Sequence, residues 1–178
     1  GDGSVVLGPV PELQESSPAT SLAAGDLNGD GKPDFSAVHE QVEVLLGNGD
    51  GTFATPTGFA AGDGPASVVI SDLDGDTKLD LAVANARSHD VSILLGNGDG
   101  TFKPAISYPL ENNPVGNTFL DDADMSMAVE DFDRDGAKDL AVSDSFAQGI
   151  SVLRGDGTGS FGGVTQKAGV SNPTSMTA

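Results

Sequence analysis

The chain has 178 residues, a length that suits one domain, and 37% of them are hydrophobic, with 25 glycines and 10 prolines. This composition favours many short elements joined by tight turns over a few long helices. The formal net charge of −19 argues against a nucleic-acid partner, because phosphate contacts need lysine and arginine. There is no membrane-spanning run of 18 apolar residues, and the absence of cysteine excludes disulfides and thiolate metal sites.

The first predicted elements belong to two units. Residues 4–13 are expected to be the fourth strand of a preceding unit, because GDGSV at the start of the chain matches GDGTF further on. Residues 19–60 form the first complete unit, which contains DLNGDGKPDFSAV from Asp26 and VEVLLGNGDGTF from Val42, an offset of 16 residues. Apolar residues alternate with a period near two in these stretches, and many are β-branched, which predicts strands.

The second unit, residues 66–109, repeats both stretches. DLDGDTKLDLAVA begins at Asp72, and VSILLGNGDGTF begins 19 residues later at Val91. Four strands are predicted in this unit, over residues 66–72, 80–85, 90–96 and 101–108.

The third unit, residues 125–167, contains DFDRDGAKDLAVS from Asp131 and ISVLRGDGTGSF from Ile150, again 19 residues apart. The unit lengths are 46 residues from position 26 to 72 and 59 from position 72 to 131, so one connection is longer by 13 residues. A period of about 45 residues with four strands predicts the blades of a β-propeller, an all-β fold of four-stranded antiparallel sheets.

The two ends of the chain point to a partial propeller. Residues 172–178 match the first strand of a unit, so we expect them to begin a following blade. Three complete blades and two orphan strands are fewer than the four to eight blades of a closed ring. The edge strands are therefore expected to pair with another chain or with blades outside this sequence.

Each unit carries an acidic nine-residue loop, residues 26–34, 72–80 and 131–139, whose positions we number one to nine. Positions one, three, five and nine offer side-chain oxygens, and position seven offers a backbone carbonyl, which is the ligand set that Ca²⁺ prefers. A helical calcium hand needs an acidic residue at position twelve, where this chain has Ala37, Val83 and Val142. The remaining alternative is a set of asparagine and aspartate turns without metal.

The stretches GDLNGDGKPD, SDLDGDTKLDLAVAN, EDFDRDGAKDLAVSD and the two copies of LLGNGDGTF resemble the FG-GAP/VCBS repeats of integrin α-subunit propellers and bacterial surface proteins. In that family the loop between strands one and two of a blade binds Ca²⁺. The resemblance implies about three Ca²⁺ ions, held by Asp26, Asn28, Asp30, Lys32 (carbonyl) and Asp34; by Asp72, Asp74, Asp76, Lys78 (carbonyl) and Asp80; and by Asp131, Asp133, Asp135, Ala137 (carbonyl) and Asp139.

Two departures from the family pattern affect these loops. Thr77 stands where the family has glycine, so the second loop is expected to be strained or to bind more weakly. Asn28 lowers the charge of the first loop by one.

The connections that differ among the units lie at the opposite end of the blades from the acidic loops. Binding residues are often found on loops carried by a regular scaffold, so we expect ligand contacts there. The candidates are Arg87, His89, Asn112, Asn113, Phe119 and Phe146.

The sequence predicts a calcium-binding recognition or adhesion module, extracellular or on a cell surface, with a glycan or protein ligand. No enzyme activity is expected, because His39 and His89 have no matching serine or cysteine constellation. Two alternatives remain open: a non-catalytic or partial propeller of a polysaccharide-processing enzyme, and an architectural repeat of a surface protein.

Overall fold

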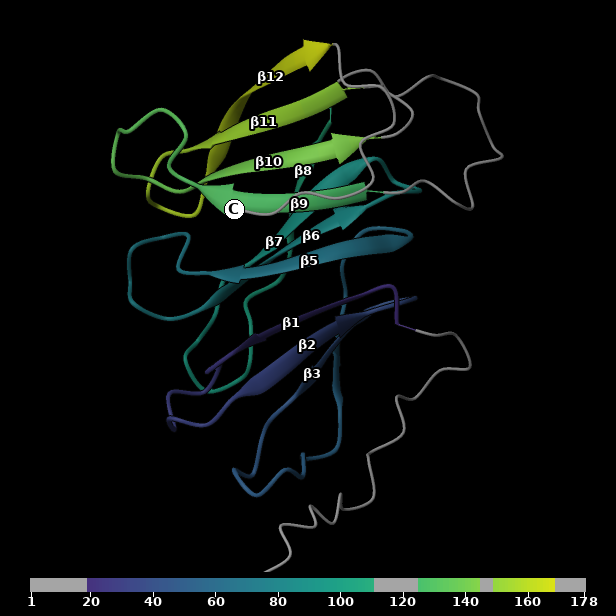
Figure 1. Cartoon of the computed structure of the whole chain (residues 1–178), viewed down its shortest axis with the longest axis vertical. Helices are drawn as coiled ribbons and strands as arrows, with labels where there is room; N and C mark the ends of the chain where they lie inside the picture. Colours follow the sequence, from purple (N-terminus) through teal and green to yellow (C-terminus); the bar gives the residue numbers. More distant parts are fainter. Residues whose placement is uncertain (1–18, 111–124, 145–148, 169–178) are drawn as a thin grey trace, which may run out of the picture.

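The computed structural model describes residues 19–110, 125–144 and 149–168, and within these ranges it contains strands and turns but no helix (Figure 1). Nothing in the described part of the chain is therefore a helix long and apolar enough to cross a membrane. The predicted orphan strands, residues 4–13 and 172–178, lie outside the described residues.

The twelve strands form three antiparallel sheets of four strands, each with its strands in chain order. The first sheet contains β1 (Ser21–Gly25), β2 (Asp34–Val38), β3 (Val42–Leu45) and β4 (Thr57–Phe59). The second contains β5 (Pro65–Ser71), β6 (Asp80–Asn85), β7 (Asp90–Leu94) and β8 (Ile106–Pro109), and the third β9 (Met125–Glu130), β10 (Asp139–Asp144), β11 (Gly149–Gly155) and β12 (Phe161–Ala168). The prediction of an all-β fold built from four-stranded blades is confirmed, and the three sheets do not close into a ring.

The fourth strand of the second sheet is shorter than the residues 101–108 predicted for it. Phe102 pairs with Gly96 in an isolated bridge, and the ladder resumes only at Ile106. Pro104 lies in this gap, and it has no N–H to donate to a neighbouring strand. In the third sheet the corresponding stretch has no proline, and β12 is a continuous strand of eight residues whose pairing with β11 shifts register once, between Val152 and Arg154.

The core lies between neighbouring sheets. One cluster of buried side chains joins the first and second sheets and another joins the second and third, with Val38, Leu81 and Leu140 fully buried. Edge-to-face ring pairs also link neighbouring sheets: Phe59 with Phe102 at 5.1 Å and Tyr108 with Phe161 at 5.7 Å between centroids. Each sheet therefore supplies one face to each neighbouring core, as blades of a propeller do.

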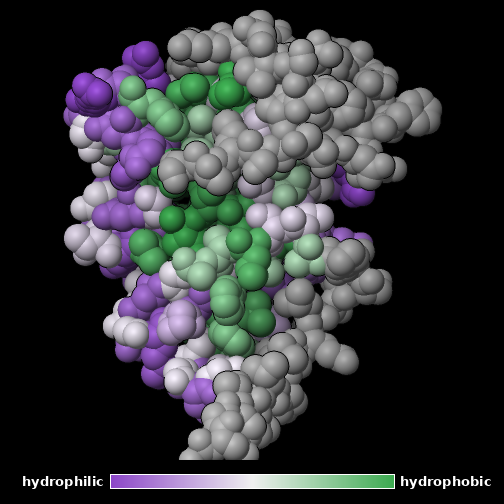
Figure 2. All heavy atoms as spheres, in the orientation of Figure 1, coloured by the Kyte–Doolittle hydropathy of each residue, from purple (hydrophilic) through white to green (hydrophobic). Residues whose placement is uncertain are grey.

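The three acidic loops lie on one side of the molecule. Each follows the first strand of its sheet and precedes the second, and in Figure 1 these connections emerge at the left edge. Hydrophilic residues gather along the same edge in Figure 2, and hydrophobic residues gather in the middle of that view. The stacking of the blades thus presents the acidic loops as one row.

Candidate metal centre

The ninth residue of each acidic loop is an aspartate, at most 1% exposed, whose two carboxylate oxygens both accept backbone N–H groups. Asp80 accepts from Leu73 through Oδ2 and from Gly96 through Oδ1, each at 2.7 Å. Asp34 and Asp139 make the equivalent bonds in the other sheets at 2.7 to 3.0 Å. One bond comes from the acidic loop and the other from a glycine at the end of strand three, so this aspartate joins the two repeated motifs.

The glycine that donates to the ninth aspartate has no room for a side chain. A Cβ at Gly96 would lie 2.2 Å from the Leu79 carbonyl oxygen, and the corresponding distances at Gly47 and Gly155 are 2.2 and 2.0 Å. This close approach of two backbones explains why glycine stands at this position in every unit.

The first and third positions shape the loop by accepting N–H groups from its own backbone. Asp72 accepts from Gly75 and Thr77, and Asp74 accepts from Asp76. The fourth and sixth positions have positive φ in all three loops, and two of these residues are not glycine: Thr77 at 71° and Arg134 at 65°. The strain expected at Thr77 is therefore present in the backbone, since a β-branched residue rarely adopts this conformation.

Carboxylates from positions one, three and nine converge in two of the loops. One oxygen from each of Asp72, Asp74 and Asp80 lies within 4.8 Å of the other two, and Asp131, Asp133 and Asp139 form the same arrangement. In the first loop Asn28 occupies the third position, so this loop offers an amide oxygen where the other two offer a carboxylate.

The fifth position lies outside these carboxylate groups. Asp76 accepts from the backbone N–H of Lys78 at 2.9 Å and from its Nζ at 2.7 Å, and Asp30 makes the same pair of bonds with Lys32. Position seven is alanine in the third loop, where Asp135 accepts only the backbone N–H of Ala137. In the second and third loops the structure thus brings three of the four predicted side-chain ligands together and pairs the fourth with the loop itself.

Charge in the loops is unbalanced. Burial raises the pKa of Asp80, and the neighbouring Asp74 and Asp72 carboxylates raise it further, against two backbone N–H groups that lower it. The hydrogen bond from the Lys78 side chain lowers the pKa of Asp76. A cation among positions one, three and nine would therefore relieve the repulsion between these carboxylates.

The donor set fits Ca²⁺. All the side-chain donors at positions one, three, five and nine are oxygens, with no histidine or cysteine among them. Each carboxylate oxygen has two acceptor sites, so the N–H bonds described above leave acceptor capacity for an ion. Such an ion would supply positive charge to a group of acids, one of which is buried.

The predicted ligand face is only partly described. Arg87 is exposed and lies 3.6 Å from the Asp63 carboxylate. His89 differs from the expectation of an exposed contact, because it is 4% exposed and sits at φ 54° in the turn between β6 and β7. Asn112, Asn113, Phe119 and Phe146 lie outside the described residues.

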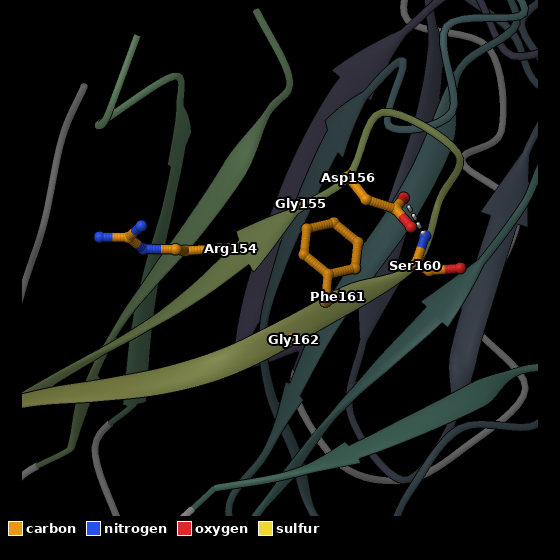
Figure 3. Close-up of a pocket in the computed structure, with 6 residues that line it drawn as sticks. All are labelled: Arg154, Gly155, Asp156, Ser160, Phe161 and Gly162. Carbon is orange, nitrogen blue, oxygen red and sulfur yellow. Dashed lines mark hydrogen bonds between the residues drawn. The ribbon is translucent and has the colours of Figure 1, made fainter. Parts of the chain in front are cut away.

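A shallow open pocket of about 440 Å³ lies where β11 turns into β12. Figure 3 shows the Phe161 ring near its centre, the Asp156 carboxylate meeting the Ser160 N–H, and the Arg154 side chain extending away from them. The guanidinium of Arg154 instead lies 3.2 Å from Asp133 Oδ2 of the third acidic loop.

Two features of the site were missed by the sequence reasoning, although the repeat contained their signal. The double role of the ninth aspartate is reflected in its constant distance of 16 residues to the glycine in two units, 80 to 96 and 139 to 155. Arg154 and Phe132 stand where the first two units have leucine, and only an alignment of the three units reveals this substitution.

Sheets of four strands stacked through shared cores, each with an acidic loop and a glycine turn at the same end, define a protein of propeller-blade repeats. Comparison with family models supports this classification as propeller-blade repeats. The FG-GAP-like repeat model matches residues 35–83 and 72–142, more than half of the chain, and the FG-GAP repeat model matches residues 18–37. The chain belongs to the FG-GAP repeat family.

Solved structures show the same fold. A lectin of Agrocybe aegerita that specifically recognises non-reducing terminal N-acetylglucosamine is 26% identical with a TM-score of 0.53, over 82% of this chain and 37% of the lectin chain. BBS1N in complex with ARL6DN is 18% identical with a TM-score of 0.55, over 90% of this chain and 47% of its own. This chain therefore spans less than half the length of either structure. A search of curated proteins finds no match.

Proposed function

We propose that this chain is a calcium-stabilised, non-catalytic recognition module that acts outside the cell or on its surface. The observation that carries the proposal is the convergence of carboxylates from positions one, three and nine, within 4.8 Å of one another, in two loops built alike. Membership of the FG-GAP family supports the extracellular setting, because repeats of this family are typical of extracellular proteins.

The ions would be held by the oxygens of positions one, three, five and nine and by the carbonyl of position seven, about one ion in each loop. The loops join strands one and two of each blade, so a bound ion would fix the ends of both strands. At millimolar Ca²⁺ and a Kd of roughly 10⁻⁴ to 10⁻³ M, each site would add about 0.4 to 1.4 kcal/mol to the free energy of unfolding.

The ligand would be a glycan or a protein, bound at the end of the blades opposite the acidic loops. Similarity to a lectin that recognises terminal N-acetylglucosamine favours the glycan. The exposed pair of Arg87 and Asp63 offers donors and acceptors at this end, with side chains 51% and 72% exposed. Because an exposed ion pair contributes little to stability, these groups are available for sugar hydroxyls at small cost.

Calorimetric titration with CaCl₂ after chelation tests the metal part of the proposal. We expect about three ions per chain and no comparable heat with MgCl₂, since Mg²⁺ retains its water more strongly.

Binding of the calcium-loaded chain to a glycan array tests the recognition part. The variant Arg87→Ala is expected to lose signal, and the variant Lys103→Ala, in the turn on the acidic-loop side, is expected to retain it. Absence of Ca²⁺ binding would contradict the metal part of the proposal. Absence of binding to both glycan and protein arrays would contradict the recognition part.

A further inference from the structure

Neighbouring blades meet through one recurring contact. The glycine turn between strands three and four of a blade lies on the leucine that directly follows strand three of the preceding blade. A Cβ at Gly100 would lie 2.8 Å from Leu46 Cδ2, and one at Gly159 would lie 2.8 Å from Leu95 Cδ2. Gly100 also donates its N–H to the Leu27 carbonyl of the preceding acidic loop at 3.1 Å.

Each blade therefore has a donor half, its glycine turn, and an acceptor half. The acceptor half is made by the second residue of the acidic loop and by the residue just before the glycine that bonds the ninth aspartate. The acceptor residues Leu27 and Leu73 are only 2% exposed, in keeping with a blade stacked beside each of them. The contact is part of the interface between the sheets and accompanies the shared cores.

The described part of the chain also has one donor half and one acceptor half that are not used. A Cβ at Gly51, in the turn of the first blade, would meet nothing within 4 Å, and Gly51 is exposed at φ 88°. At the other end of the row, Phe132 is 49% exposed and the Arg154 side chain 59%. These two residues occupy the positions of the leucines in the used contacts.

The two free halves each present one exposed charged side chain, and these two charges are opposite. Arg154 replaces Leu46 and Leu95, so the free acceptor has a guanidinium, 3.2 Å from Asp133 Oδ2, where the used acceptors have an apolar side chain. Asp50 directly precedes Gly51 in the free donor turn, and its side chain is exposed. Opposite charges across an interface favour one pairing and penalise others.

We propose that this chain associates head to tail, with the 48–52 turn of one copy docked on Phe132 and Arg154 of another. The Gly51 N–H then bonds the Phe132 carbonyl, as Gly100 bonds Leu27 within the chain. Asp50 lies beside the Arg154 guanidinium. The two surfaces differ, so the contact is heterologous and extends into a ring or an open row of chains.

Sedimentation velocity over a concentration series tests this proposal by a charge exchange, with all samples in CaCl₂. The wild type is expected to form assemblies larger than a monomer. Asp50→Arg and Arg154→Glu each place like charges across the contact, so each variant alone is expected to associate at least about tenfold more weakly. An equal mixture of the two variants restores opposite charges in both directions and is expected to restore association.

Asp99→Arg is the matched control, because Asp99 occupies the same place in the turn of the second blade and accepts the same threonine bonds as Asp50. Its turn is already stacked within the chain, so association should match the wild type. A wild type that stays monomeric at every concentration would overturn the proposal. Both halves would then be contact surfaces for further blades of a longer chain. Failure of the mixture to restore association would overturn it equally.

Discussion

At the residue scale, the ninth aspartate of the acidic loop serves the fold independently of any metal. Asp80 is 1% exposed and accepts two backbone N–H groups that have no other acceptor described here. Asp76, the fifth residue, is exposed enough to bond a lysine at the surface. The two aspartates would both be ligands, but only the first also holds two segments of backbone together.

Asp80→Ala is therefore expected to destabilise the protein even in excess chelator. It leaves two buried N–H groups unpaired, at a cost of about 2 to 4 kcal/mol in the free energy of unfolding. Asp76→Ala is the matched control and should cost much less than Asp80→Ala in chelator, because its partner is solvated. Urea denaturation of both variants in EDTA measures the difference, and equal losses would contradict the clamp assigned to Asp80.

Thr77→Gly is expected to stabilise the protein. Thr77 has a φ of 71°, whereas glycine adopts such angles freely. Relief of backbone strain should exceed the entropic cost of glycine and yield a net gain of about 1 kcal/mol. Thr57→Gly in the extended strand β4 is the control and should lose stability. Thermal melts in chelator compare the two, and a loss at both positions would show that Thr77 is unstrained.

At the element scale, the strands follow from the sequence where an apolar run lies between two turns. The strand predicted over residues 80–85 coincides with β6, in which every residue of Asp80–Asn85 is buried. The prediction for residues 101–108 gave too little weight to Pro104, which interrupts the ladder. A period-two pattern shows which residues suit a strand but does not show which N–H groups find partners.

The acidic loops could be predicted as oxygen clusters, but their internal pairing could not. The spacing of aspartates gave the ligand type, because carboxylates at alternate positions of a tight loop must lie close together. The Oδ1 bond of Asp80 to Gly96 depends on the approach of two segments in space. Similarly, burial of His89 depends on the packing around its turn, which a sequence of loop residues does not reveal.

Gly96→Ala tests the junction between the acidic loop and the glycine turn. The added methyl group would lie 2.2 Å from the Leu79 carbonyl oxygen, so one backbone must move. We expect a loss of about 2 to 4 kcal/mol in the free energy of unfolding. Gly162→Ala, where a Cβ meets nothing within 4 Å, should change it by less than about 0.5 kcal/mol. If chemical denaturation gives the two variants the same free energy of unfolding, the close approach at Gly96 does not restrict this position to glycine.

At the scale of the whole molecule, each pair of neighbouring blades shares one core and one turn contact. Val38 and Leu81 belong to the cluster between the first two sheets, and Leu140 belongs to the cluster between the second and third. An ion bound in any loop would stiffen the end of its blade and thereby the interface with the next. Calcium would therefore stabilise the stack of blades as a unit.

We propose that the acidic loops bind Ca²⁺ and that this binding stabilises the blades. The most direct test of this proposal is the Tm measured in CaCl₂, in MgCl₂ and in EDTA, for the wild type and for the double variant Asp74→Ala with Asp133→Ala. These side chains belong to the two carboxylate groups and make only local turn bonds and the exposed pair with Arg154. We predict a rise in Tm specific to Ca²⁺ that the double variant largely loses. Equal Tm values in CaCl₂ and EDTA for the wild type would contradict the proposal.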